Sequence, residues 1–529
     1  MVSVRADLEY RSVPGLLTRA VERFPDADAV VDDEVRLTFG QLAELAGTAT
    51  RAAIAAGLGH GDRAAIWAPN IHEWVVAALS VQGTGAAIVP LNTRFKGREA
   101  ADILRRSGAR ALFCVNGFLG TDHLGLLASS GIELPALEHT VVLRGRVPPG
   151  AIGWAEWLAR GSAIGTGAAR DRWAAVCPDD LSDIIFTSGT TGRPKGVMYT
   201  HGQALRVVET WADVVGLRAG DRYLVVNPFF HIFGYRAGWT ACLMKGATLI
   251  PQPVFDVRQT MARVAEQRVT VLPGPPTLYQ MILDSPERPT HDLSSLRLAV
   301  TGAATVPVEL VRRMREELPF ETIITGYGLT ETGTVTMCRA GDDAETIAST
   351  AGRAVPGAEV RIVDDAGAEL PPGQAGEVVT RGYHVMRGYV DDPVATAEVI
   401  DGDGWLHTGD IGVLDGRGYL RIVDRKKDMF IVGGFNAYPA EIEQALVRHP
   451  RVSQAAVIGI PDPRLGEVGM AFIVLRGGGA IDEDELVAWS RAEMANFKVP
   501  RRWLFVDGLP LNASGKVLKT ELRHWAAGT

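Results

Sequence analysis

The sequence has few cysteines and no long apolar segment. Its four cysteines, at positions 114, 177, 242 and 338, include no C-x-x-C pair. This pattern argues against a disulfide framework or structural zinc, and we expect each cysteine to be a small buried residue of a reduced protein. No uninterrupted apolar run reaches about 18 residues, and residues 1–9 lack the apolar core of a signal peptide. We therefore expect a cytoplasmic protein with no integral membrane association.

The sequence also lacks a basic excess. Lys and Arg total 54 against 62 for Asp and Glu, which gives a formal net charge of −8 and a pI of about 5.8. Proteins that bind nucleic acids usually carry a basic excess or a basic face. We therefore expect no nucleic acid partner, although local positive groups can still hold a small anion.

The length and composition are those of a multidomain globular protein. A chain of 529 residues is too long for one core, and a typical domain length of about 150 residues predicts three or four folding units. Hydrophobic residues make up 47% and charged residues 22% of the chain, which indicates neither disorder nor a fibrous repeat.

The most informative stretch spans residues 184–196. An apolar run, Ile184 to Phe186, leads into a loop of Thr, Ser, Gly, Pro and Lys, whose hydroxyls, uncovered N–H groups and one ammonium suit phosphate oxygens. We expect the phosphates to be bound by Thr187, Ser188, Gly189, Thr190, Thr191, Gly192 and Lys195. The spacing is not that of a Walker A loop, and Gly196 stands where that motif has its magnesium-binding hydroxyl, so a magnesium ligand must come from elsewhere. The alternative is a flexible turn between core elements, but the length of the pattern favours a phosphate loop.

Two further loops follow predicted strands. Apolar strands and amphipathic helices alternate through residues 13–331, which predicts a largely parallel sheet covered by helices. Residues 144–170, rich in Gly, Ala and Arg, are predicted to be a mobile surface connection. Small residues follow one strand at 302–304, and the loop 327–331 ends in a hydroxyl and a carboxylate. Ligands gather beyond the carboxyl ends of parallel strands, so these loops and the phosphate loop could converge on one nucleotide, with Glu331 supplying an oxygen ligand to magnesium.

The pattern changes after residue 352. Short strands between Gly and Pro turns in residues 352–422 predict an antiparallel barrel or sandwich. Within it, Asp410 can accept two hydrogen bonds from a ribose diol, although capping a turn is the simpler alternative. The charged run 424–428 precedes a small module with its own helices and strands, so we place a domain boundary there.

Six ordered segments, 186–196, 230–234, 327–331, 405–410, 424–436 and 512–516, together resemble the motifs of the acyl-CoA ligase branch of the adenylate-forming (ANL) superfamily. Segments 91–94, 227–231, 272–276 and 300–307 resemble more closely the actinobacterial ligases that act on ring-bearing propanoates left by steroid breakdown. The resemblance implies an α/β protein whose large N-terminal domain, residues 1–426, holds two doubly wound α/β subdomains and a small β-barrel. A small mobile α+β domain, residues 427–529, is expected to follow.

The same resemblance implies a two-step reaction with ATP, Mg²⁺ and coenzyme A. A carboxylate displaces pyrophosphate from ATP to give an acyl-adenylate, and the coenzyme A thiolate then displaces AMP. Glu331 would bind magnesium, Thr330 would touch the α-phosphate, and Lys516 would stabilise charge that develops in the first step. The adenosine would be bordered by Gly302, Ala303, Ala304, Tyr327 and Gly328 and its ribose held by Asp410 and Arg425. The last domain would rotate about Lys427 so that the loop of Gly433 and Gly434 replaces Lys516.

The acid is expected to be bulky and hydrophobic. Alone, His231 would more often be a hydrogen-bonded core histidine, but by its H-x-F-G pattern it would gate the coenzyme A tunnel. The predicted acyl pocket consists of Phe230, Tyr235, Trp239 and Gly326, and apolar side chains of this kind do not suit acetate or an amino acid.

Several alternatives stay open at this stage. Phe435 and Leu511 depart from residues common in the family, which could weaken one half-reaction. The acyl group could also pass to a carrier-protein phosphopantetheine, or the chain could be a nucleotide-dependent binding protein without turnover. Retention of Lys195, Glu331, Asp410 and Lys516 together argues against the last alternative. The oligomeric state, with a homodimer among the options, is open.

Overall fold

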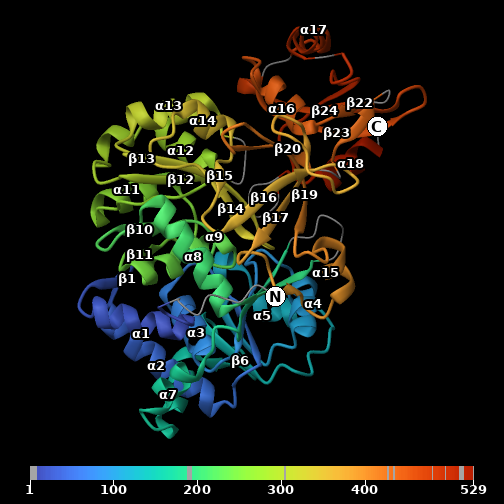
Figure 1. Cartoon of the computed structure of the whole chain (residues 1–529). Coiled ribbons are helices and arrows are strands. Elements are labelled where there is room, and N and C mark those ends of the chain that lie inside the picture. Colours follow the sequence, from blue (N-terminus) through green and yellow to red (C-terminus); the bar gives the residue numbers. More distant parts are fainter. Residues whose placement is uncertain are drawn as a thin grey trace. The chain divides into compact units, whose positions relative to one another are not determined.

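The computed structural model describes most of the chain (Figure 1). The described residues are 9–187, 194–302, 306–425, 428–432, 435–478, 481–494, 496–511 and 517–527, with only the backbone described at 425, 435, 436 and 478. The chain divides into two compact units, Met1–Glu359 with Thr380–Leu406, and Val360–Val379 with His407–Thr529. The expected hinge boundary at residues 426 and 427 stays a prediction, because both residues lie outside the described ranges.

The first unit contains an eight-stranded sheet. Its order is β18-β9-β8-β4-β3-β5-β6-β7, and the pairs from β8 to β7 are parallel, whereas β9 and β18 run antiparallel to their neighbours. The strands are β3 (Arg63–Trp67), β4 (Ala87–Pro90), β5 (Ala111–Asn116), β6 (His139–Gly145), β7 (Ile152–Gly153), β8 (Leu181–Phe186), β9 (Gly196–Thr200) and β18 (Gly388–Tyr389).

A second sheet region completes the first unit. One four-stranded part has the order β10-β11-β1-β2 and the other β12-β13-β14-β15, and bridges from Val271 to Tyr223 and to Leu298 join them. The strands are β1 (Asp28–Asp32), β2 (Val35–Thr38), β10 (Arg222–Val225), β11 (Thr248–Pro251), β12 (Leu298–Gly302), β13 (Thr322–Leu329), β14 (Gly333–Met337) and β15 (Arg353–Ala354). The two sheet regions confirm the α/β class predicted from the alternating pattern.

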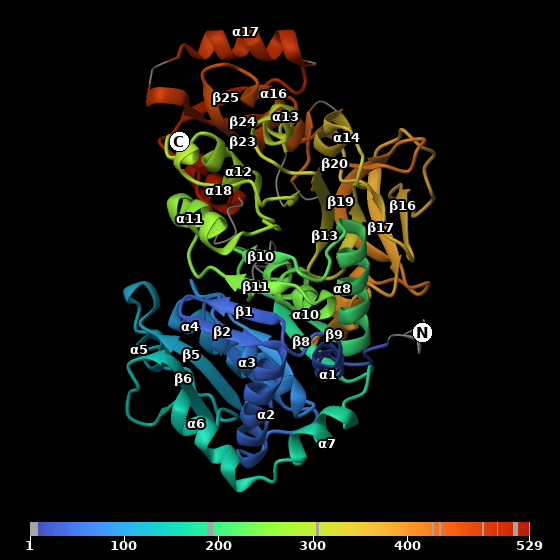
Figure 2. The same ribbon diagram turned by 90° about the vertical axis from the view of Figure 1, so that its left-hand side faces the viewer.

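Helix α3 (His72–Gly83) joins the two sheets through one core. Every residue from Glu73 to Gly83 is buried, and the helix contacts β3 and β4 of one sheet and β1 of the other. Helix α2 (Phe39–Ala55) packs beside it, as Figure 2 shows. Because α3 is covered on all sides, its apolar residues are spread around the helix rather than confined to one stripe. The other helices of eight or more residues in this unit are α1 (Val13–Arg23), α4 (Gly97–Ser107), α7 (Ala168–Ala175), α8 (His201–Val215), α11 (Val257–Gln267), α12 (Pro276–Leu283) and α13 (Val308–Glu317).

The segment 144–170 is more ordered than its composition suggests. It contains β7 and helix α6 (Trp154–Arg160) and leads into α7. Trp157 on α6 is fully buried, with its ring edge-on to Phe113 at 5.4 Å between centroids. The segment lies mostly at the surface, as predicted, but it contains regular structure, and one buried tryptophan anchors it to the sheet.

The cysteine prediction holds at three positions and fails at one. Cys114, Cys242 and Cys338 are buried, and burial raises the pKa of the Cys338 thiol to about 11. Cys177, in contrast, is exposed.

The second unit contains two sheets. One sheet has the order β16-β17-β19-β20, made of β16 (Ala358–Val363), β17 (Gly376–Gly382), β19 (Leu406–Leu414) and β20 (Leu420–Arg425). Another has the order β22-β21-β24-β23 with β25 beside β24, made of β21 (Phe430–Val432), β22 (Phe435–Ala437), β23 (Val452–Asp462), β24 (Gly466–Leu475) and β25 (Arg502–Phe505). Helices α16 (Pro439–Val447), α17 (Glu483–Glu493) and α18 (Lys519–Ala527) belong to this unit.

Candidate active site

The two ends of the predicted phosphate loop are joined by a pair of hydrogen-bonded strands. Strands β8 and β9 pair antiparallel up to Phe186 and Gly196, and the Thr187 N–H donates to the Lys195 carbonyl at 3.0 Å. The predicted loop residues Ser188, Gly189, Thr190, Thr191 and Gly192 lie outside the described residues. Thr187 and Lys195 thus stand opposite each other where the loop leaves the sheet.

Arg106 on α4 contacts both sides of this loop base. Its Nη1 donates to the Pro194 carbonyl at 2.6 Å, and its guanidinium lies 5.2 Å from the centroid of the Phe186 ring. One cationic side chain therefore holds the strand residue before the loop and the residue that ends it. Nothing in the local pattern of α4 had pointed to this arginine.

A buried ion pair lies on the same strand. The Asp183 carboxylate on β8 accepts from Arg236 Nη2 at 2.6 Å and from the Tyr235 hydroxyl at 3.2 Å, and both members of the ion pair are at most 3% exposed. The Arg236 guanidinium also stacks on the Tyr199 ring of β9, 3.7 Å from its centroid. Arg236 and Tyr235 belong to a π-helix, Tyr235–Thr240. The ion pair thus joins the phosphate-loop strand to the segment that follows His231.

Glu331 and Lys195 meet through a third residue that sequence analysis missed. Glu331 lies in the turn between β13 and β14, and its Oε1 accepts from the Tyr389 hydroxyl at 3.0 Å. The Lys195 Nζ lies 4.9 Å from the centroid of the same tyrosine ring. Burial, and to a lesser degree the Glu331 charge, raise the pKa of Tyr389 above its usual range, so this hydroxyl is a neutral donor. The predicted cation and the predicted magnesium ligand are therefore neighbours.

The glycines of the Glu331 loop are required by close backbone contacts. A Cβ at Gly328 would lie 1.8 Å from the Gly333 carbonyl, and one at Gly326 would lie 2.9 Å from the Thr336 carbonyl. Gly302 on β12 pairs with Gly326 on β13, so these two predicted loops are adjacent. Ala303 and Ala304 lie outside the described residues, and the contact of Tyr327 with a base and of Thr330 with the α-phosphate stay predictions.

The residues predicted to hold the ribose belong to the second unit. Asp410 on β19 is 3% exposed and pairs with Arg425 on β20 in an antiparallel register. Their proposed ribose contact stays a prediction. Lys427, Gly433, Gly434 and Lys516 lie outside the described residues.

The aromatic residues predicted for the acyl pocket are packed tightly. Tyr235 and Trp239 are each 1% exposed, with ring centroids 5.3 Å apart, and Trp74 on α3 contacts both rings. Phe230 is partly buried. The structure thus assigns Tyr235 and Trp239 to packing, and their contact with an acid stays a prediction.

His231 differs from the core histidine considered as its alternative. It is exposed and caps a short helix, with its Nδ1 accepting from the Phe233 N–H at 3.2 Å. Asn70 holds the preceding segment through hydrogen bonds to the Asn227 carbonyl at 2.9 Å and from the Phe229 N–H at 2.7 Å. Asn70, which lies 157 positions from Asn227 in the chain, therefore holds the segment that leads to His231.

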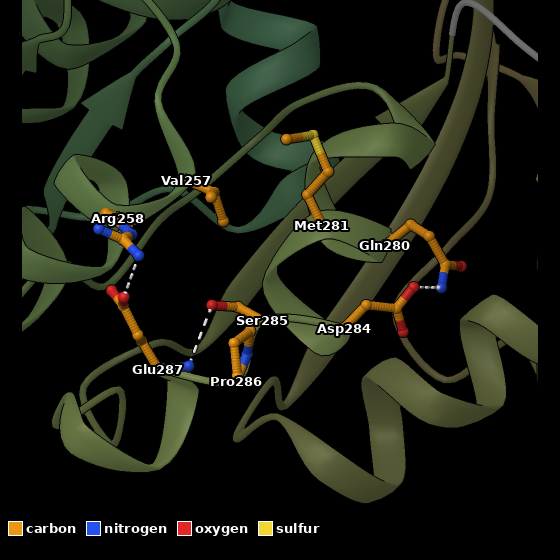
Figure 3. Close-up of a pocket in the computed structure, with 8 residues that line it drawn as sticks. All are labelled: Val257, Arg258, Gln280, Met281, Asp284, Ser285, Pro286 and Glu287. Atoms are coloured by element: carbon orange, nitrogen blue, oxygen red, sulfur yellow. Dashed lines mark hydrogen bonds and ion pairs between the residues drawn. The ribbon is translucent and has the colours of Figure 1, made fainter.

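The described residues contain two other features of interest, a surface pocket and a group of possible metal ligands. A surface pocket of about 330 Å³, which Figure 3 shows, is lined by Val257, Arg258, Gln280, Met281, Asp284, Ser285, Pro286 and Glu287, none of which is a predicted site residue. Asp32, His72 and Glu73 bring possible metal ligands within 4.8 Å of one another, but Arg144 Nη2 bonds Asp32 at 2.8 Å and Glu73 at 2.7 Å. The Arg144 guanidinium therefore already pairs with both carboxylates, and its single charge offsets one of their two. In the described ranges, every helix is too short or too polar to cross a bilayer.

Comparison with known proteins identifies the class. Residues 17–390 match the AMP-binding enzyme family and residues 441–516 match the AMP-binding enzyme C-terminal domain. The chain therefore belongs to the AMP-binding enzyme family, which confirms the acyl-CoA ligase of the adenylate-forming superfamily predicted from the motifs.

Two close relatives carry one and the same name, 3-[(3aS,4S,7aS)-7a-methyl-1,5-dioxo-octahydro-1H-inden-4-yl]propanoyl:CoA ligase. The relative from Rhodococcus jostii is 50% identical, over 97% of this chain and 98% of its own. The relative from Mycobacterium tuberculosis is 52% identical, over 98% of this chain and 99% of its own. Among solved structures, the anthranilate CoA ligase AuaEII in complex with anthranoyl-AMP matches with a TM-score of 0.89 and 28% identity, over 100% of both chains.

Proposed function

We propose that this protein activates a bicyclic, ring-bearing propanoic acid with ATP and transfers the acyl group to coenzyme A. The acid is of the class named for the two relatives, a dioxo-octahydroindenyl propanoate. Identity of 50% and 52% over nearly the whole chain supports this substrate class. The main structural support for ATP-dependent chemistry is that Lys195 and Glu331 contact the same side chain, Tyr389.

In the first step, an oxygen of the acid attacks the α-phosphorus of ATP and pyrophosphate leaves. Lys195, Thr187 and the intervening loop would hold the leaving phosphates, since an ammonium, hydroxyls and loop N–H groups are suited to them. Lys516 would stabilise the charge that develops between the carboxylate and the α-phosphate. Asp410 and Arg425 would hold the ribose.

Glu331 fits a magnesium site by its chemistry. Its carboxylate supplies the oxygen ligand that Mg²⁺ prefers, and the Tyr389 hydroxyl fixes one of its oxygens at 3.0 Å. Magnesium bound there would neutralise phosphate charge. Glu331, held by Tyr389, would therefore be the residue that holds the ion.

In the second step, the coenzyme A thiolate attacks the acyl carbonyl and AMP leaves. His231, exposed at a helix start, would stand at the thiol entrance. The loop of Gly433 and Gly434 would replace Lys516 by rotation of the last domain about Lys427. Adenylation makes this attack feasible because AMP is a far better leaving group than oxide.

The test separates the two steps. The purified protein is incubated with MgATP and a panel of acids, namely the bicyclic propanoate, a medium-chain fatty acid, ferulate and acetate. We expect pyrophosphate release and, with coenzyme A, a thioester identified by mass, both greatest for the bicyclic acid. Equal rates with acetate would contradict the substrate class, and pyrophosphate release without thioester would contradict transfer to coenzyme A.

A further inference from the structure

The segment 386–390 lies between the two loops that the proposed function joins. The Met386 N–H donates to the main-chain carbonyl of Glu331 at 2.8 Å, and the Val390 N–H donates to the carbonyl of Gly196 at 2.8 Å. Between them, β18 pairs with β9, with Tyr389 opposite Val197. One short segment is therefore bonded to the strand that leaves the phosphate loop and to the turn that carries Glu331.

The side chain of Tyr389 also connects the two loops, because it contacts one charged residue from each. Its hydroxyl donates to Glu331 Oε1 at 3.0 Å, while the face of its ring receives the Lys195 ammonium at 4.9 Å. The residue is 7% exposed, and its N–H is held by Thr396 Oγ1 at 2.9 Å, so the ring is fixed from both ends.

We propose that Tyr389 is a positioning residue that orients the Glu331 carboxylate toward the magnesium ion of MgATP and places the Lys195 ammonium beside the same phosphates. A hydroxyl that donates to one carboxylate oxygen fixes the orientation of the whole carboxylate, including the oxygen that faces the metal. Hydrogen bonds of this kind to a metal ligand raise the affinity of the site for the metal. The aromatic face attracts the cation without neutralising it, which leaves the lysine charge for phosphate. This inference rests on the proposed function, because it assigns Tyr389 to the nucleotide site proposed above.

The experiment measures magnesium dependence without requiring turnover. Thermal unfolding of the full chain is followed at fixed ATP while Mg²⁺ is varied, and the half-saturating Mg²⁺ concentration is read from the rise in midpoint. For Tyr389→Phe, which keeps the ring and loses the hydroxyl, we expect this concentration to rise roughly tenfold, the size of one hydrogen bond to a charged group. The Mg²⁺ requirement for pyrophosphate release should shift in parallel.

Tyr383→Phe is the matched control. Its hydroxyl also donates a hydrogen bond, to Thr210 Oγ1 at 2.8 Å, and its ring also receives a cation, Arg206 at 5.3 Å. If the effect of Tyr389→Phe were general destabilisation, both variants would shift the Mg²⁺ dependence alike, and the proposal would be overturned. We expect Tyr383→Phe to leave that dependence unchanged.

A double variant tests the route of the effect. In a Glu331→Gln background, adding Tyr389→Phe should change the Mg²⁺ dependence little, since the carboxylate that the hydroxyl orients is already gone. A full additional tenfold shift would show that Tyr389 acts elsewhere and would overturn the proposal.

Failure of every acid to react would contradict the proposed function alone, provided that MgATP stabilisation and its Tyr389 dependence persist. Absence of any MgATP stabilisation in the unmodified chain would overturn this inference.

Discussion

The Asp183 carboxylate and the Arg236 guanidinium form an ion pair of 2.6 Å in which neither side chain is more than 3% exposed. Asp183 belongs to the strand that enters the phosphate loop, and Arg236 belongs to the π-helix after His231. π-Helical turns cost regular hydrogen bonding and are frequent at functional sites. The ion pair fixes this turn against the strand, so the predicted phosphate and acyl regions share one buried support.

Breaking this ion pair should destabilise the first unit strongly. Arg236→Met leaves the Asp183 charge buried without its partner, which typically costs about 3–5 kcal/mol. We expect a clear fall in the midpoint of urea or thermal unfolding. Combining Arg236→Met with Asp183→Asn should recover part of the loss, because no charge then remains buried. As a control, Arg19→Met removes two exposed ion pairs, with Glu9 and with Glu22, and should cost only about 1 kcal/mol. Equal effects of the two single variants would contradict this account.

Arg106 should matter for nucleotide affinity more than for stability. Arg106→Met removes the bond to the Pro194 carbonyl and the stacking on Phe186, so the base of the phosphate loop loses its support. We expect the KM for ATP to rise roughly fivefold to tenfold, the size of one such hydrogen bond. The neighbouring Arg105→Met is the control, since that arginine is exposed and contacts only Asp102 among the ion pairs of the described residues. An unchanged KM for ATP in Arg106→Met would show that the loop needs no such support.

Two buried histidines predict acid sensitivity of the fold. Burial lowers the pKa of His201 and of His384 to about 4, and His201 Nδ1 accepts from the Val13 N–H at 3.2 Å. Because the folded pKa lies below the unfolded value of about 6.5, the full stabilisation is present above pH 6.5 and is lost as the pH falls toward 4. Each histidine can cost about 3 kcal/mol over this interval.

The measurement is the unfolding midpoint between pH 7 and pH 4. His201→Asn keeps an acceptor near the Nδ1 position but cannot titrate in this range, so its midpoint should fall less steeply with acid. The exposed His524→Asn should follow the unmodified chain. Identical slopes for all three proteins would refute the assignment.

Lys516 should separate the two half-reactions. Lys516→Ala removes the cation that the family resemblance assigns to adenylation, and oxyanion stabilisation of this kind is commonly worth about 100-fold to 1000-fold in rate. We expect pyrophosphate release to fall by that order. Thioester formation from a synthetic acyl-adenylate and coenzyme A should fall less than about tenfold. Equal losses in both assays would contradict a role confined to the first step.

Sequence patterns predicted the strand ends where the signal is local. The apolar run from Ile184 to Phe186 predicted a strand before the phosphate loop, and β8 ends at Phe186. The loop predicted at 327–331 begins later, because Tyr327 to Leu329 still belong to β13. The supports of these loops were missed because they come from distant parts of the chain. Tyr389 lies 58 residues from Glu331, and Asn70 lies 159 residues from Phe229.

Composition does not reveal the effect of single residues. The Gly, Ala and Arg content of residues 144–170 predicted a surface connection, and the segment does lie mostly at the surface, but the buried Trp157 anchors it. Tyr235 and Trp239, named for an acyl pocket by their aromatic character, pack against Trp74, and their contact with an acid stays a prediction. Residue type alone does not distinguish a pocket wall from core packing, since both need large apolar surfaces.

The central claim is that the acid itself attacks the α-phosphorus of ATP before coenzyme A takes the acyl group. The most direct measurement uses the bicyclic propanoate labelled with ¹⁸O in both carboxylate oxygens, incubated with the protein, MgATP and coenzyme A, and mass analysis of the nucleotide product. The account predicts one ¹⁸O in each AMP formed and one in the thioester. Unlabelled AMP, or label in inorganic phosphate together with ADP, would contradict it.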